Sequence, residues 1–220
     1  MDQEAPAAAS KVEPTRRDVL RVASGVAGAA AVVGAVGAAA YMVRWLDETA
    51  RPATPPAAGA VDIDLSPFQA GQQVMVFWRS LPVFVVRRGA QALAALHDPD
   101  LVGQLADPAS DQLQQPPYAK NPERSIKPEF AVLVGVCTHM GCTPTFYPQP
   151  HASDPVPDWP GGYLCPCHGS RYDLAGRVFK DVPAPYNLPV PPYRFLDDKT
   201  LRIGENPANA KFDFNAILQI

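Results

Sequence analysis

The pattern of hydrophobic and polar positions divides the chain into three parts. An uncharged run from Val22 to Val43, rich in Ala, Gly and Val, is about as long as a helix that crosses a bilayer. Residues 47–60 are rich in proline and alanine and have no apolar periodicity, which is typical of a linker. From Val61 onward, short alternating and β-branched runs predict strands. We therefore predict one transmembrane anchor helix at 22–46, a flexible hinge linker at 47–60 and a folded domain at 61–220.

Eight short segments of the third part have the pattern of strands. They are residues 61–65, 74–78, 82–86, 130–136, 162–164, 171–179, 193–196 and 200–203, of which 171–179 is interpreted as strand, turn and strand. The close spacing of the second and third segments, and of the last two, predicts two hairpins. A short helix is predicted at 91–96, a long loop with one helical turn at 101–127, and no element at 206–220. The predicted fold class is all-β, a small stacked-sheet or barrel-like domain.

Composition narrows the function classes. The chain has 220 residues, enough for one domain with appendages, and a net charge of −3, so no basic field favours nucleic acid as a partner. The 26 prolines agree with long loops. The four cysteines are few and clustered, which favours a cofactor over a disulfide scaffold.

The segment before the apolar run has features of an export signal. Arg16 and Arg17 resemble the pair of a twin-arginine signal, although Val19 stands where Phe is common. A Sec-type anchor and a cleaved signal peptide are the alternatives. The twin-arginine interpretation is favoured because a cofactor-bearing domain would be exported folded. Positive charges before the run predict that residues 1–21 are cytoplasmic, so that a single-pass protein of the bacterial inner membrane carries its domain in the periplasm.

Two short boxes hold all four cysteines, at Cys137–Cys142 (CTHMGC) and Cys165–Ser170 (CPCHGS). Four sulfurs are too many for one Cys2His2 metal site, but they suit a cluster with two Cys and two His ligands plus one disulfide. Structural zinc and two plain disulfides are the alternatives. The Cys-X-Cys-His spacing is unusual for zinc, and two plain disulfides leave the neighbouring histidines unexplained. His97 and His151 lie in predicted loops and are interpreted as ordinary surface residues.

These boxes resemble those of the Rieske iron–sulfur protein of the cytochrome bc1 complex. The resemblance covers most of the chain and includes the N-terminal anchor, Gly71-Gln72, Trp78-Arg79, Pro82-Val83-Phe84, Gly135-Val136, Ser170-Arg171-Tyr172-Asp173, Ala175-Gly176-Arg177 and Asn187–Tyr193. It implies a Rieske-type antiparallel head domain with its cluster-binding part at about 130–192. It also implies a [2Fe–2S] cluster as cofactor.

The resemblance further implies how the site residues divide their roles. The implied cluster ligands are Cys137 and Cys165 on one iron, and His139 and His168 on the other. The implied disulfide joins Cys142 and Cys167. Ser170 is implied to donate a hydrogen bond to a bridging sulfide, and Tyr172 to a cysteine sulfur, that of Cys137. Such hydrogen bonds favour the more negative, reduced cluster and raise its potential.

A second set of residues is implied to cover the cluster and to dock on cytochrome b. It comprises Met140, Gly141, Pro183, Ala184 and Pro185. Two positions depart from the family pattern. Met140 stands where Leu is usual, and both are apolar. Val182 stands where Gly is usual, and because Val does not readily adopt φ above zero, the loop conformation at its first residue is in doubt.

The implied function is electron transfer within quinol–cytochrome c oxidoreductase. His168, or His139, would accept a proton as the cluster accepts an electron from ubiquinol, and the electron would pass to cytochrome c1 by movement of the head on its linker. Cytochrome b, cytochrome c1, the membrane and a dimeric bc1 complex are the implied partners. The alternatives are a Rieske ferredoxin or oxygenase component, the Rieske subunit of arsenite oxidase, and a periplasmic zinc domain. The loop cysteines, Ser170, Tyr172 and the anchor argue against a ferredoxin.

Overall fold

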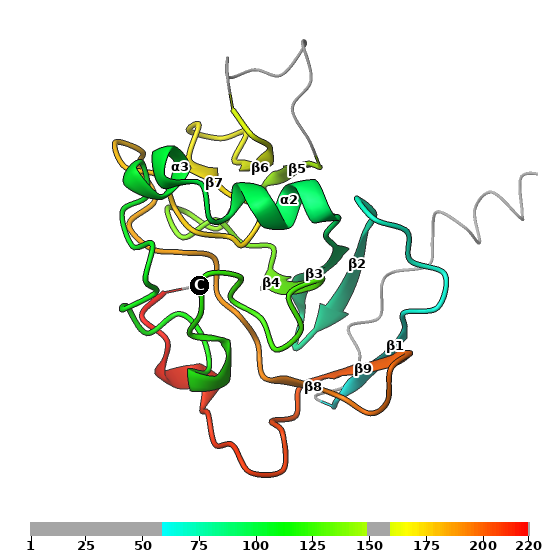
Figure 1. Cartoon of the computed structure of the whole chain (residues 1–220). Helices are drawn as coiled ribbons and strands as arrows, with labels where there is room; N and C mark the ends of the chain where they lie inside the picture. The colour runs from blue at the N-terminus through cyan, green and yellow to red at the C-terminus, as the bar shows by residue number, and fades with distance from the viewer. Residues whose placement is uncertain (1–58, 149–158, 220) are drawn as a thin grey trace, which may run out of the picture. The chain divides into compact units, whose positions relative to one another are not determined.

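The computed structural model describes residues 59–148 and 159–219 (Figure 1). The chain divides into two units, Met1–Ala53 and Thr54–Ile220, and all described residues belong to the second. The predicted cytoplasmic segment, the anchor helix and most of the linker therefore lie outside the described residues, as does His151. Within the two described ranges, no helix combines the length and the apolar character needed to cross a membrane.

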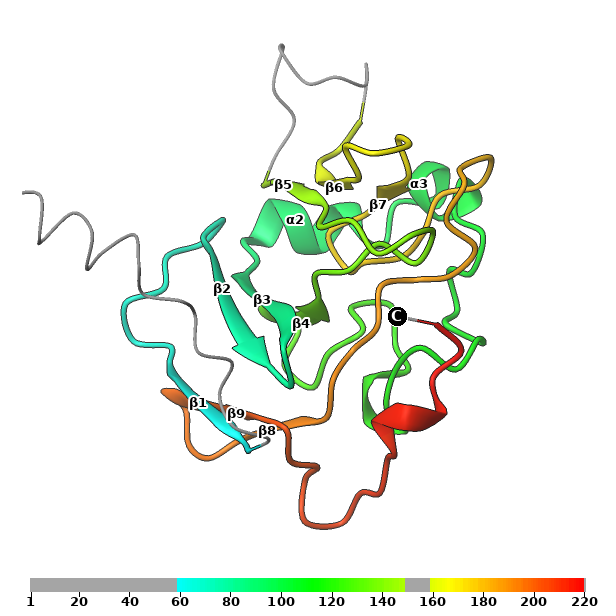
Figure 2. The same cartoon turned by 180° about the vertical axis from the view of Figure 1, so that it is seen from behind.

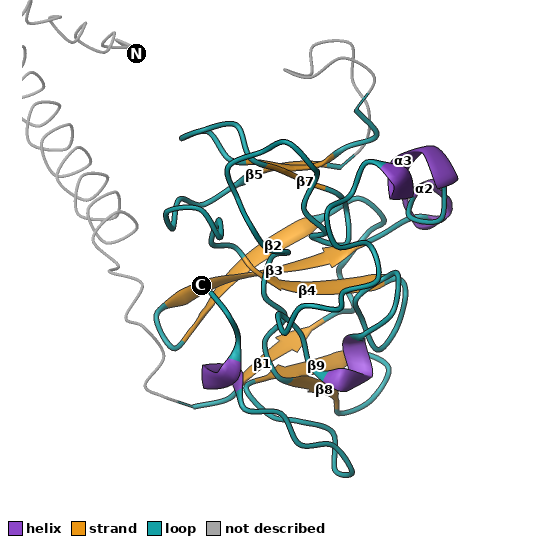
Figure 3. Ribbon diagram, turned by 90° about the vertical axis from the view of Figure 1, so that its left-hand side faces the viewer, coloured by secondary structure: helices purple, strands orange, loops and turns teal. Residues whose placement is uncertain are grey.

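Three antiparallel three-stranded sheets build the domain, which confirms the all-β prediction. Figure 3 shows them one above another, with the sheet β2-β3-β4 in the middle. The strands, grouped by sheet in spatial order, are β1 (Val61–Asp64), β9 (Thr200–Ile203) and β8 (Tyr193–Phe195); β2 (Gln73–Trp78), β3 (Leu81–Arg87) and β4 (Phe130–Val134); and β5 (Thr145–Tyr147), β6 (Gly162–Leu164) and β7 (Arg171–Tyr172). Short helices lie between or after them, namely α2 (Ala90–Ala95), α3 (Pro99–Gly103) and the 3-10 turns η1 (Pro117–Ala119) and η2 (Phe214–Ala216).

The middle sheet forms the main core. Every residue of β4 is buried, as the continuous apolar run predicts, because both faces of this strand are covered. The hairpin β2–β3 turns through two residues, Arg79 and Ser80, whose φ angles are 49° and 64°. The predicted connection of three residues is one residue too long, since Leu81 already pairs with Trp78. The Arg79 guanidinium lies 4.6 Å from the centre of the Trp78 ring, which favours this turn.

The sheet β5-β6-β7 carries the two boxes and differs most from the prediction. β5 was not expected, because a strand of three residues is too short to show a periodic pattern. The predicted strand, turn and strand at 171–179 is only partly formed, since β7 covers two residues and Val178 makes one isolated bridge to Tyr172. The short helix α2, which was predicted, lies beside this sheet. Figures 1 and 2 show the two from opposite directions.

The segment predicted as a long loop at 101–127 is packed rather than free. It contains the end of α3 and the turn η1, and its buried polar residues include Gln114 and Arg124. The Arg124 guanidinium donates hydrogen bonds to the carbonyl oxygens of Ala175 and Gly176, at 3.1 and 3.3 Å. Burial lowers the pKa of Arg124 to about 9, so it remains charged at neutral pH. This segment therefore supports the turn that follows β7.

Candidate metal centre

The two boxes are loops with the same local geometry, one after β4 and one directly after β6. In the first box, the Gly141 amide donates to the Cys137 carbonyl at 2.9 Å, and the Cys137 amide donates to the Cys142 carbonyl at 2.8 Å. In the second, the Gly169 amide donates to the Cys165 carbonyl at 3.0 Å, and the Cys165 amide to the carbonyl of the box's last residue at 2.8 Å. Both glycines have positive φ, 82° and 73°, which explains their place in each box.

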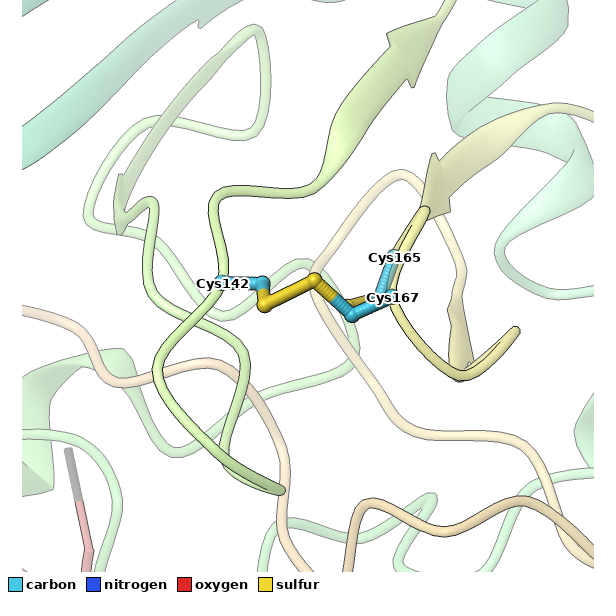
Figure 4. A group of neighbouring side chains, drawn as sticks. All are labelled: Cys142, Cys165 and Cys167. Atoms are coloured by element: carbon cyan, nitrogen blue, oxygen red, sulfur yellow. A yellow bond between two sulfur atoms is a disulfide. The ribbon is translucent and has the colours of Figure 1, made fainter.

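A disulfide joins the two loops. Figure 4 shows the bond between Cys142 and Cys167. Its S–S distance is 2.08 Å. The predicted pairing is confirmed. The remaining two cysteines, Cys137 and Cys165, are free and buried, so the alternative of two plain disulfides is wrong.

Three sulfur atoms from the two loops lie close together. Those of Cys142, Cys165 and Cys167 all lie within 4.8 Å of one another (Figure 4). These three do not form a thiolate site, because two of them are in the disulfide. Burial raises the pKa of the Cys165 thiol, and its neighbour Cys137 raises it further. The Cys165 thiol, whose pKa is raised in this way, would become a thiolate when a metal charge lies beside it.

Two imidazoles complete the set of donors. The ring centres of His139 and His168 are 4.7 Å apart and the rings are nearly perpendicular, at 85°. His139 Nδ1 is buried and has no hydrogen-bond partner among the described residues. A buried nitrogen of this kind costs roughly 1–3 kcal/mol, which a metal bond would offset. Two buried thiols and this nitrogen fit a [2Fe–2S] cluster of the two-Cys, two-His type.

The hydroxyl of Tyr172, on β7, lies against the first box. It donates a hydrogen bond to Cys137 Sγ at 3.3 Å and accepts one from the Thr138 amide at 3.2 Å. Thr138 Oγ1 is 3.3 Å from the same hydroxyl and donates its own proton to the Tyr186 carbonyl at 2.7 Å. Burial, followed by contact with Cys137, raises the pKa of Tyr172, so the hydroxyl remains a donor. Sequence reasoning missed Thr138, although it stands between two predicted ligands.

Ser170 connects the second box with the loop that contains Pro183, Ala184 and Pro185, here called the covering loop. Its side chain is fully buried, and Oγ accepts a hydrogen bond from the Ala184 amide at 3.0 Å. The hydroxyl proton of Ser170 therefore remains available for another acceptor. The covering loop accommodates the departure at Val182, because the positive φ of 56° falls on Asp181 instead.

The outer end of the site is apolar and exposed. Met140 has 72% of its surface exposed, and Gly141 beside it is also exposed. On the covering loop, Pro183 and Pro185 are exposed and Ala184 between them is buried. Four of the five predicted docking residues are thus exposed, and so is His168. His97, interpreted as a surface residue, is exposed and contacts Glu123 at 2.7 Å.

We predict that Tyr172→Phe lowers the midpoint potential of the cluster without removing it. The variant loses the hydrogen bond to Cys137 Sγ. If that bond favours the reduced cluster by about 1 kcal/mol, the potential falls by about 40 mV. Potentiometric titration followed by EPR measures the change. Tyr163→Phe is the matched control, because the buried Tyr163 hydroxyl has no hydrogen-bond partner among the described residues; equal potentials for the two variants would contradict the assignment.

Comparison with known proteins agrees with this geometry. The Rieske [2Fe-2S] domain family matches residues 118–193. The chain is 48% identical over 206 residues to the ubiquinol-cytochrome c reductase iron-sulfur subunit of Allochromatium vinosum, which covers 93% of this chain and 96% of that protein. It is 42% identical over 203 residues to the subunit of the same name from Blastochloris viridis, with 92% and 99% covered.

Among solved structures, a chain of a hyperthermophilic respiratory Complex III is 28% identical and covers 81% of this chain and 98% of its own length. Its TM-score is 0.39, which is a weak structural similarity. The family assignment is based on the two bacterial relatives, because their sequence identity extends over nearly the whole of both chains. The protein therefore belongs to the family of Rieske [2Fe–2S] iron–sulfur subunits of ubiquinol–cytochrome c reductase.

Proposed function

We propose that the chain is the electron-transfer subunit of a cytochrome bc1 complex, which takes an electron from quinol and passes it to cytochrome c1. The observation that carries the proposal is the combination of an exposed His168 with two free, buried cysteines, Cys137 and Cys165, in two loops that a disulfide joins. The names of the relatives, ubiquinol-cytochrome c reductase iron-sulfur subunits, support this function over that of a ferredoxin or an arsenite oxidase subunit.

The chain's own residues hold the cofactor from two sides. Cys137 and Cys165 would bind one iron as thiolates, and His139 and His168 would bind the other through imidazole nitrogens. When bound, a [2Fe–2S] cluster of this type accepts one electron at a raised potential, because two histidines replace two cysteines on one iron. The buried cysteines exclude water from their side of the site, and the disulfide holds the two loops together.

The histidines supply the proton acceptor. His168 is exposed, so its ring nitrogen that does not bind iron can accept a hydrogen bond from the hydroxyl group of a quinol. That nitrogen would then hold the proton that the quinol hydroxyl releases. Nδ1 of His139, which is buried and has no hydrogen-bond partner among the described residues, would be its ligand atom, and Nε2 would be the second candidate acceptor.

The remaining partners follow from the membrane complex. We propose that the exposed surface around Met140 docks on cytochrome b, within a dimeric complex of the bacterial inner membrane. The anchor predicted at 22–46 holds the domain near its partners, and the linker predicted at 47–60 lets it move between cytochrome b and cytochrome c1. In this complex the chain contributes to quinol–cytochrome c oxidoreductase activity.

Met140→Asp tests the proposed docking. Because Met140 is exposed, we expect the variant to fold and to keep its cluster, while quinol-dependent cytochrome c reduction falls at least tenfold. A charge buried at an interface without a partner costs several kcal/mol. The assay uses membranes of a strain in which the variant replaces the native chain. Met140→Leu, which keeps an apolar tip, is the control; full activity of the Asp variant with a normal EPR signal would contradict the docking surface.

A further inference from the structure

The C-terminal tail, residues 205–219, packs along the domain and ends beside the long segment that precedes β4. Phe214 is buried, and its ring meets that of Trp78 edge to face with centres 5.1 Å apart. Asn206 accepts a hydrogen bond from the Tyr118 hydroxyl at 3.0 Å. The sequence pattern predicted no element here, and the proposed function assigns the tail no role.

Gln114 receives the end of the tail. Its side chain is fully buried, and its Oε1 accepts hydrogen bonds from the amides of Leu218 and Gln219, at 3.0 and 3.2 Å. Its Nε2 donates to the Gln219 carbonyl at 2.9 Å and to the Asn187 carbonyl at 3.1 Å. All four hydrogen-bonding positions of the carboxamide are thus used, three on the tail and one on Asn187.

Asn187 lies just after the loop that covers the site. Its Oδ1 accepts a hydrogen bond from the Val178 amide at 2.8 Å, and the Gln114 carbonyl accepts one from the Val190 amide at 2.8 Å. The carbonyl immediately before Asn187, that of Tyr186, is the acceptor of the Thr138 hydroxyl. The segment 186–190 is therefore held by Gln114 on one side and by the first box on the other.

This geometry decides where the Tyr172 proton goes. The Tyr172 hydroxyl lies at 3.3 Å from both Cys137 Sγ and Thr138 Oγ1 and has one proton. While Thr138 donates to the Tyr186 carbonyl, its Oγ1 is held 3.3 Å from the Tyr172 hydroxyl, which is long for an O–H···O bond but not for a bond to the larger sulfur atom. If that carbonyl moves, Thr138 can turn and its Oγ1 can come closer to the Tyr172 hydroxyl, where it competes with the sulfur of Cys137 for the proton.

We propose that the C-terminal tail positions the segment 186–190 through Gln114, and thereby orients the Tyr172 hydroxyl toward Cys137. Gln114 is a positioning residue, since it touches neither the ligands nor quinol. The inference rests on the proposed function only in using the cluster potential as one of its two readouts. The other readout, amide exchange in 186–190, is independent of any redox activity.

Leu218→Pro tests the proposal with the smallest change. Proline removes the amide that donates to Gln114 Oε1 and also to the Leu113 carbonyl, at 3.2 Å. Ile217 before it already has φ −63° and ψ 155°, which suit a residue preceding proline. Leu218→Ala, which keeps the amide on an exposed residue, is the matched control. Gln114→Leu and the double variant with Leu218→Pro complete the set.

We expect Leu218→Pro to speed amide exchange in 186–190 at least about fivefold, the change given by one lost hydrogen bond. Gln114→Leu, which removes all four side-chain hydrogen bonds, should speed it at least as much. Both should lower the midpoint potential of the cluster in the full-length chain, and the double variant should do no more than the stronger single one. Leu218→Ala should change neither. Unchanged exchange in Leu218→Pro, unchanged potential with faster exchange, or fully additive effects in the double variant would overturn the proposal. Absence of a Rieske EPR signal in the native chain would instead refute the proposed function.

Discussion

Replacing both Cys142 and Cys167 by serine is expected to destabilise the domain by roughly 3.5 kcal/mol and to release the cluster. The disulfide closes a loop with a sequence separation of 25 residues. In the chain-entropy account, closing a loop of that size raises the free energy of the unfolded chain by about this amount. The same bond links the two loops that carry the predicted ligands, so we expect its loss to let the two predicted pairs of ligands separate. Urea denaturation of the cluster-free protein and iron content per chain measure the two effects.

Reduction of the native disulfide supplies the control for this variant. Native protein treated with a phosphine reductant should denature at the same urea concentration as the double-serine protein, whereas the reductant should leave the double-serine protein unchanged. A double-serine protein with full iron content and the native urea midpoint would show that the disulfide holds neither the fold nor the loops.

Among residues that are not predicted metal ligands, we expect Gly162 to be the one whose replacement by alanine destabilises the domain most. Gly162 has φ of 132°, and a Cβ there would lie 2.1 Å from the Tyr172 carbonyl oxygen and 2.9 Å from backbone atoms of Asp173. Backbone on the neighbouring strand cannot move away without separating β6 from β7. We expect a loss of more than about 3 kcal/mol, and displacement of the Tyr172 hydroxyl from Cys137. Denaturation and the cluster EPR signal measure both.

Gly71→Ala separates this clash from the strain of positive φ alone. Gly71 has φ of 84°, and a Cβ there would find only Pro148, at 3.9 Å. Its replacement should therefore cost about 1–2 kcal/mol and leave the EPR signal unchanged. If the two alanine variants were equally stable, the close approach of β6 and β7 would not be the reason for glycine at position 162.

The sequence pattern predicts the strands of this domain better than their partners. The alternation at Val61 and the final hairpin are local signals, and both are confirmed. The pairing of β1 with β9, which sets Val61 opposite Ile203, joins segments too far apart for any local period to reveal. The buried Arg124 was missed for a similar reason, since a polar, proline-bearing segment gives no sign that its charge meets carbonyl groups of a distant turn.

In the candidate site, too, the local features were predicted from the sequence and the long-range contacts were not. The boxes stand out by residue type and spacing, and the resemblance supplied the disulfide pairing that the structure confirms. Thr138 and Gln114 were not predicted to matter, because their partners Tyr186 and Leu218 lie 48 and 104 residues further along the chain. The division of ligand roles between the cysteines and histidines stays a prediction that spectroscopy must test.

Low-temperature EPR of membranes that contain the full-length chain tests the central claim most directly. After reduction with ascorbate, we expect a rhombic Rieske signal whose shape changes when a quinol-site inhibitor is added. That result would require a high-potential cluster with histidine ligands and its docking at a quinol site. A signal that appears only with dithionite would show a low-potential, ferredoxin-like centre and contradict the bc1 assignment, and no signal under either reductant would point to zinc.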